Sequence, residues 1–303
     1  MRKFIRKMFQ GCLILIFLFP IALLLLIRFT DGEIGNGPEK ILLGYDESRN
    51  TWQFDTSRRY DFDGTDGPYI FGRQLIRVDN EGQVRIDSLR PDSIDIFVDN
   101  EDQDHFKVKL MPNSSTPPDQ YSFPKRLLAL SDIEGNFNAF SSLLIQHEVM
   151  SPDYRWTFGS GGLVLLGDCM DRGKHVLPVL WLIYHLEQQA IAAGGQVHFI
   201  IGNHEVMNFQ GHFRNAQDKY KALALAIGMH NNRQDNYRRL YSPDSFLGQW
   251  MRRKNVIERI GPYLFVHAGL NPDLLDHQLS INDINRLVRQ NWDQDVSADS
   301  VIQ

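Results

Sequence analysis

Three short polar segments carry residue types that form metal sites, and each follows directly on an apolar run. They are Ser131-Asp132-Ile133-Glu134-Gly135, Gly167-Asp168-Cys169-Met170-Asp171-Arg172-Gly173 and Gly202-Asn203-His204-Glu205. A fourth apolar run, residues 263–266, leads into His267-Ala268-Gly269 in the same way. Ligands of open α/β sheets bind in the crevice beyond the carboxyl ends of the strands. The sequence therefore predicts four strand ends that converge on one metal-binding pocket.

The carboxylates of the first two segments suit a pair of divalent cations. Two cations about 3.5–4 Å apart repel each other, and a shared anionic ligand makes the pair tolerable, which is the role we predict for Asp168. Asp132 is predicted to bind the first metal, with Glu134, two residues on, directed to the same side. Oxygen and imidazole ligands suit Mn, Fe, Zn or Mg. Taken alone, Asp132 and Glu134 are equally consistent with capping of the helix that follows.

The remaining polar residues suggest phosphoryl chemistry. Asn203 offers a neutral oxygen ligand, and His204 beside it is predicted to protonate a leaving group near neutral pH. Asp171 would orient that imidazole, and Arg172 would grip phosphate oxygens with its planar guanidinium. His267 fits a ligand of the second metal, although a single histidine after an apolar strand is more often a core residue.

The elements that must position these residues alternate between strands and helices after Pro124. We predict strands at 126–131, 162–166, 196–201 and 263–267, helices at 136–147 and 175–193, and a further helix from Ser242-Pro243 toward Arg253. This alternation is typical of right-handed βαβ units in a buried, partly parallel sheet. The predicted α/β domain covers residues 125–303.

The region before this domain has a different pattern. Residues 31–111 alternate apolar and polar side chains with a period of two, as in Ile94-Asp95-Ile96-Phe97-Val98, and turn clusters separate the runs. We interpret it as a small all-β domain, followed by a linker at 112–124. The formal net charge of −5 offers no basic surface for nucleic acid, and Cys12 and Cys169 provide no disulfide framework.

The first 30 residues are predicted to form a transmembrane anchor. Arg2, Lys3, Arg6 and Lys7 precede an apolar run over residues 11–27, which reaches the lower length limit for spanning a bilayer. The positive-inside rule places the N-terminus in the cytoplasm and the rest of the chain outside it, in the periplasm if the source is bacterial. A cleaved signal peptide is the alternative, but no small-x-small cleavage pattern follows residue 27.

The motifs G-D-x-x-D-R-G, G-N-H-E and H-A-G, after a D-x-x-G segment, resemble those of the calcineurin-like metallophosphoesterases. Within that group they resemble the phosphoprotein phosphatases and, through residues 206–214, the Shewanella-like branch. The resemblance implies an α/β/β/α sandwich with a dinuclear site, in which a metal-bound hydroxide attacks phosphorus in line. It also implies the following roles: Asp132 and Asp168 for the first metal, Asp168, Asn203 and His267 for the second, His204 with Asp171 as proton donor, and Arg172 for phosphate.

Two departures from the family pattern bear on this assignment. Glu134 stands where the family has histidine, which replaces a neutral nitrogen ligand by an anion. No late G-H-T histidine follows His267, so either the sequence is a piece of a longer protein or the second metal has fewer ligands. The sandwich would then be incomplete at its C-terminal side, with an exposed sheet edge.

We therefore expect a membrane-anchored, metal-dependent phosphatase that acts on a phosphoprotein or a small phosphomonoester. A phosphodiesterase or dinucleotide hydrolase would use the same site chemistry. The competing class is a degenerate, non-catalytic binding protein that holds a phosphorylated ligand at the membrane, with the β domain binding a protein partner. A purely structural envelope protein is the remaining alternative.

Overall fold

The computed structural model describes residues 32–34, 39–46, 51–58, 64–89, 92–111, 115–228, 233–271 and 277–294. The chain divides into two compact units, Met1–Tyr60 and Asp61–Gln303. In the first unit, β1 (Gly32–Ile34), β2 (Glu39–Asp46) and β3 (Thr51–Arg58) form an antiparallel sheet in that order. The predicted transmembrane segment at 11–27 lies outside the described residues. Among the helices in the described part, none is long and apolar enough to cross a membrane.

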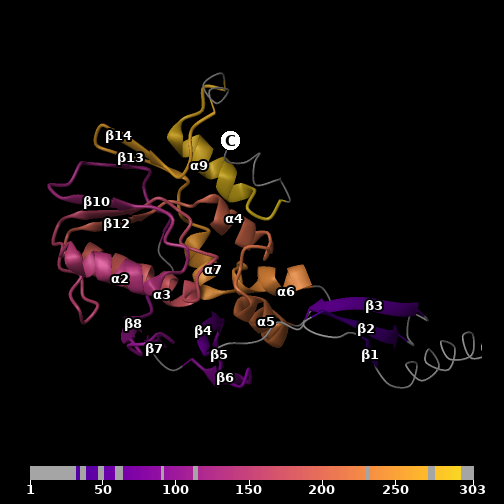
Figure 1. The fold of residues 1–303 in the computed structure, drawn as a ribbon. Helices are drawn as coiled ribbons and strands as arrows, with labels where there is room; N and C mark the ends of the chain where they lie inside the picture. Colours follow the sequence, from indigo (N-terminus) through magenta and orange to yellow (C-terminus); the bar gives the residue numbers. More distant parts are fainter. Residues whose placement is uncertain are drawn as a thin grey trace, which may run out of the picture. The chain divides into compact units, whose positions relative to one another are not determined.

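A parallel sheet forms the centre of the second unit. Its strands are β10 (Leu127–Leu130), β11 (Gly162–Leu165) and β12 (Gln196–Phe199), paired in that order. All four residues of β11 are buried, as expected for the central strand of a covered sheet. Helices α2 (Phe137–Gln146) and α3 (Val176–Ala192) make the connections and lie along one side of the sheet (Figure 1). The predicted strand-helix alternation is confirmed, with ends that differ by one or two residues.

A second sheet packs against the other face of the first. It contains β9 (Gln120–Tyr121), β13 (Ile257–Ile260) and β14 (Tyr263–Val266), in the order β14-β13-β9. Strands β13 and β14 lie on the side of the first sheet opposite α2 and α3 (Figure 1). Val164, Ile200 and Ile260 form a small apolar cluster between the sheets. Beside it, the buried pair of His198 and Glu258 joins the two sheets with an Nδ1 to Oε2 distance of 2.7 Å. Helix α9 (Ile281–Gln290) contacts β13, and its Asn285 accepts hydrogen bonds from the backbone at the start of that strand.

Two small antiparallel sheets precede the central sheet in the chain. One contains β4 (Asp66–Phe71), β5 (Gln74–Val78) and β6 (Val84–Ser88), and the other β7 (Ser93–Phe97) and β8 (His105–Lys109). The period-two pattern holds in β7 and β8, whose alternate residues are buried. In β6 it does not hold, because the apolar Ile86 is 60% exposed.

The predicted separate β domain at 31–111 differs from the observed division. Strands β4 to β8 belong to the same compact unit as residues 125–303, and their buried residues join the same hydrophobic core. Helix α3 makes this junction: Trp181 donates to the carbonyl of Pro68 at 3.1 Å, and the Tyr184 hydroxyl accepts from the backbone N–H of Met111 at 2.9 Å. A helix that is apolar on every face needs cover on both sides, and these strands supply the second side.

Four further helices complete the described part of the second unit: α4 (Asn203–Phe209), α5 (Asp218–Ile227), α6 (Arg233–Leu240) and α7 (Phe246–Met251). The predicted helix from Ser242-Pro243 corresponds to α7, which begins later because the Ser245 side chain caps it by accepting from the backbone N–H of Gly248. Helix α4 starts at the end of β12, so it fixes Asn203 and His204 at the carboxyl edge of the central sheet.

Candidate metal centre

The loops at the carboxyl ends of the strands bring four predicted metal ligands together. Ligand atoms of Asp132, Asp168 and His267, which follow β10, β11 and β14, all lie within 4.8 Å of one another. His267 Nε2 is 3.2 Å from Asp168 Oδ2 and 3.0 Å from Asn203 Oδ1. The core-histidine alternative for His267 does not hold, because the ring nitrogen faces two ligand oxygens instead of apolar atoms.

The donor set fits a divalent cation. Two carboxylates, an imidazole and an amide oxygen are ligands that Zn, Fe and Mn accept. The Nδ1 of His267 donates to the carbonyl of Leu166 at 2.5 Å, and this kind of bond fixes ring orientation and leaves Nε2 as the ligand atom. The hydrogen bond with Asp168 raises the pKa of His267 to about 9, so a cation that binds here must replace a proton.

Asp168 is held from two directions. Its Oδ1 accepts from the backbone N–H of His204 at 3.0 Å, while its Oδ2 faces His267. Burial acts to raise the pKa of Asp168, but the hydrogen bonds from His267 and from the His204 backbone outweigh burial and lower it. The residue predicted to be the shared ligand is therefore an oriented anion.

Glu205 organises these loops, and the sequence reasoning gave it no role. Its fully buried carboxylate accepts backbone N–H bonds from Gly202, Asp168 and Cys169 at 2.9 Å each and from Met170 at 3.2 Å. Burial, and then the charge of Asp168, raise the pKa of Glu205 to about 7, while the backbone donors act in the opposite sense. Its position as the third residue of a helix capped at Gly202 was the available signal.

His204 and Asp171 form the predicted pair. The His204 Nδ1 lies 2.7 Å from Asp171 Oδ2, and both side chains are buried. This hydrogen bond raises the pKa of His204 against the opposing effect of burial. With Nδ1 so engaged, the His204 Nε2 faces the ligand cluster, 3.8 Å from Asp168 Oδ2. The imidazole is therefore placed as a proton donor requires, and Asp171 favours its protonated form.

Helix α4, which carries His204, is fixed by hydrogen bonds that connect it to α6. Asn208 donates to the backbone carbonyl of His204 at 2.8 Å, and its own side-chain oxygen accepts from the Tyr237 hydroxyl of α6 at 2.8 Å. All three residues are buried. This chain of contacts ties the position of His204 to α6, an element that the sequence analysis did not predict.

Glu134 is the exception among the predicted ligands. It does not join the Asp132, Asp168 and His267 group; its Oε1 instead makes an ion pair with Nη1 of Arg172. Glu134 and Asp132 both have positive φ, at 49° and 54°, so the segment turns sharply and is not the extended segment that would direct Glu134 to the same side as Asp132. The helix-capping alternative is also wrong for this pair, because Asn136 supplies the cap of α2.

Backbone strain is concentrated around the ligands. Asp168, Asp171 and Arg172 also have positive φ, at 52°, 68° and 53°. The left-handed region costs a residue with a side chain about 1–2 kcal/mol, and such residues cluster at functional sites.

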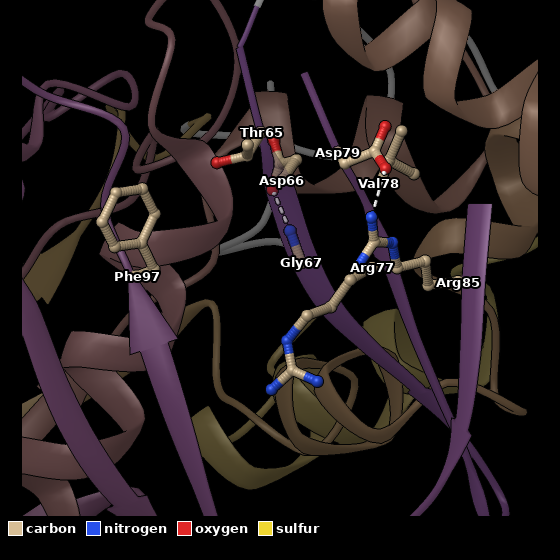
Figure 2. Close-up of a pocket in the computed structure, with 8 residues that line it drawn as sticks. All are labelled: Thr65, Asp66, Gly67, Arg77, Val78, Asp79, Arg85 and Phe97. Carbon is tan, nitrogen blue, oxygen red and sulfur yellow. Dashed lines mark hydrogen bonds and ion pairs between the residues drawn. The ribbon is translucent and has the colours of Figure 1, made fainter. Parts of the chain in front are cut away.

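A separate pocket lies away from these residues. It has a volume of about 280 Å³ and is lined by Thr65, Asp66, Gly67, Arg77, Val78, Asp79, Arg85 and Phe97 (Figure 2). Its arginines have acidic neighbours: Arg85 is 3.1 Å from Asp79, and Arg77 is 3.8 Å from Asp87. None of the predicted site residues lines this pocket.

The sequence matches the calcineurin-like phosphoesterase family model over residues 125–302, more than half of the chain. The chain belongs to the calcineurin-like phosphoesterase family. The match begins where the α/β domain was predicted to begin and includes every residue of the ligand cluster.

Relatives place this phosphoesterase in the Shewanella-like branch. It is 27% identical over 183 residues to Shewanella-like protein phosphatase 1 of Plasmodium berghei, which covers 60% of this chain and 49% of the relative. It is 35% identical over 95 residues to Shewanella-like protein phosphatase 2 of Arabidopsis thaliana, 31% of this chain and 24% of the relative. The chain thus spans about half or less of these two relatives.

Solved structures agree with this placement. A cold-active protein-tyrosine phosphatase of a psychrophilic Shewanella species superimposes with a TM-score of 0.67 at 32% identity, over 76% of this chain and 69% of the other. A second structure of a cold-active protein tyrosine phosphatase gives a TM-score of 0.68 at 32% identity, over 77% and 68% of the two chains.

Proposed function

We propose that this chain is a metal-dependent phosphatase that hydrolyses phosphomonoesters at a dinuclear centre. The observation that carries the proposal is the gathering of Asp132, Asp168 and His267 at one sheet edge, with the buried His204–Asp171 pair beside them. Family membership and the Shewanella-like relatives, whose names describe phosphatases, support the same activity. The substrate we propose is a phosphoprotein or a small phosphomonoester.

Each side chain has a part in this reaction. Asp132, Asp168, Asn203 and His267 would hold two divalent cations, which when bound supply positive charge for the phosphoryl oxygens and activate a water molecule. The Arg172 guanidinium, next to this cluster, binds phosphoryl oxygens. His204 gives its Nε2 proton to the departing oxygen, while Asp171 keeps Nδ1 protonated and the ring in place.

A His204→Ala variant is expected to lower kcat for 4-nitrophenyl phosphate by about a hundredfold, because it removes the proton donor. The KM should change little, since the phosphate-binding groups remain. Steady-state kinetics with Mn²⁺, Fe²⁺ or Zn²⁺ measures both constants. As a matched control, His147→Ala replaces an exposed histidine at the end of α2 and should leave both unchanged.

The non-catalytic binding protein is the alternative that this measurement also tests. A wild-type chain that hydrolyses no phosphoester with any of these metals, and contains well under one metal ion per chain, would favour binding over catalysis. Release of phosphate from a monoester but not from a diester would separate the phosphatase from a phosphodiesterase.

The proposal includes attachment to a membrane through residues 11–27, which rests on their apolar composition and the preceding cations. The full chain is expected in the membrane fraction after carbonate washing and in the detergent-soluble fraction afterwards. A chain that begins at Thr30 should stay in the supernatant. Recovery of both in the supernatant would contradict the anchor.

A further inference from the structure

The ion pair between Glu134 and Arg172 places a carboxylate directly on the proposed phosphate-binding group. Glu134 follows β10 and Arg172 follows β11, so the pair bridges two neighbouring loops of the site. The Glu134 side chain is 24% exposed, and that of Arg172 is 58% exposed. Both are therefore open to an incoming ligand.

The backbone holds this pair in position. The N–H of Glu134 donates to the carbonyl of Asp168 at 2.9 Å, and the N–H of Arg172 donates to the carbonyl of Asn215 at 3.0 Å. The first bond ties the backbone of Glu134 to the loop of Asp168, and the second ties the backbone of Arg172 to the segment of Asn215.

The pair occupies donors that a phosphoryl group would use. Nη1 of Arg172 is bound to Glu134, and Nη2 lies 3.5 Å from His204 Nε2. A guanidinium binds phosphate best through two parallel N–H bonds. A phosphoryl group at this cluster must therefore share Arg172 with Glu134 or displace the carboxylate.

The charge of Glu134 acts differently on different esters. A phosphomonoester and inorganic phosphate carry about 1.5–2 negative charges at neutral pH, whereas a phosphodiester carries one. Repulsion from a fixed carboxylate a few Å away is proportional to the charge of the ligand, so it weighs about twice as heavily on the dianion. The site already contains Asp132, Asp168 and Asp171, and Glu134 adds an anion that is not part of the candidate ligand group.

We propose that Glu134 is a specificity-determining residue. By occupying Arg172 it weakens the binding of phosphate dianions, and so it reduces the preference of the site for monoesters over diesters. The expected change in hydrolysis rates rests on the proposed function, whereas the expected change in phosphate binding does not.

Glu134→Gln removes the charge with little change in shape, and Glu134→Asn is a second variant whose residue type tolerates the positive φ of this position. Calorimetric titration of inorganic phosphate into Mn²⁺-loaded protein should show a Kd about tenfold lower in both variants. The kcat/KM for 4-nitrophenyl phosphate should rise about tenfold and that for bis(4-nitrophenyl) phosphate about threefold, so the ratio of diester to monoester should fall about threefold. Asp153→Asn is the matched control, because Asp153 forms an exposed ion pair with Arg155 away from the site.

Metal content separates this role from that of a ligand. Glu134→Gln is expected to retain the metal content of the wild type, and a marked loss of metal would identify Glu134 as a ligand and overturn the proposal. Phosphate affinity that is unchanged or weaker in both variants would also overturn it. If the wild type hydrolyses neither ester but both variants bind phosphate more tightly, the proposed function fails while the role of Glu134 stands.

Discussion

An Asp168→Asn variant is expected to lose hydrolytic activity by about a thousandfold or more, together with most of its bound metal. Asp168 is the buried carboxylate that faces His267 Nε2 at 3.2 Å and lies in the same group as Asp132. An amide keeps the shape of the side chain, but it removes the negative charge that two neighbouring cations would share. Metal analysis of the purified protein and turnover of 4-nitrophenyl phosphate measure the two losses.

Asp293→Asn is the control for this experiment. Asp293, whose side chain is 57% exposed, pairs with Arg252 at 2.8 Å, and it takes no part in the ligand cluster. Its amide variant should keep the metal and the activity of the wild type. An Asp168→Asn protein with wild-type metal content and turnover would remove the basis of the proposed centre.

A Glu205→Ala variant is expected to lose about 4 kcal/mol or more of unfolding free energy. Four backbone N–H groups that now donate to this carboxylate would remain buried without an acceptor, and each such group costs about 1–3 kcal/mol. Three of these donors belong to Asp168, Cys169 and Met170, so the loss falls on the loop that carries the predicted shared ligand. Urea unfolding monitored by circular dichroism measures it.

Glu205→Gln tests whether the effect reaches the metal site. The amide keeps one acceptor oxygen and turns donors toward the remaining N–H groups, so metal affinity should fall about ten- to a hundredfold, as for other residues that orient ligands. Glu187→Gln alters another buried carboxylate, which binds Lys254 and Trp250 far along the chain. It should lower stability without changing metal affinity. Equal metal affinity in the wild type, Glu205→Gln and Glu187→Gln would show that Glu205 has no positioning role.

The ligand cluster could be predicted because parallel strands end at a common edge. Each of Asp132, Asp168 and Asn203 lies within a few residues of a strand end, and the topology alone brings such positions together. Glu134 could not be placed in the same way. A spacing of two residues puts side chains on one side only in extended backbone, and here two positive φ angles turn the segment toward Arg172.

The domain organisation shows the same limit at a larger scale. Alternation predicted the buried positions of β7 and β8, since it reflects a local property of each strand. The surface that those positions contact is not local. The sequence of α3 indicated that the helix is covered on both sides, because few residues from Val176 to Leu186 are polar. A pattern in one helix does not say which strands will cover its second side.

The loops of Asp168 and Asn203 touch through bare backbone. A Cβ placed on Gly167 would lie 2.6 Å from the Cα of Gly202, and one on Gly202 would lie 2.7 Å from the backbone nitrogen of Asp168. Where Gly167 meets Gly202 no side chain lies between the two segments, so neither can move closer to the other. The spacing between the ligand-bearing loops is thus limited by the main chain. Selection among metal ions by ionic radius would then depend on the backbone as much as on the ligand side chains.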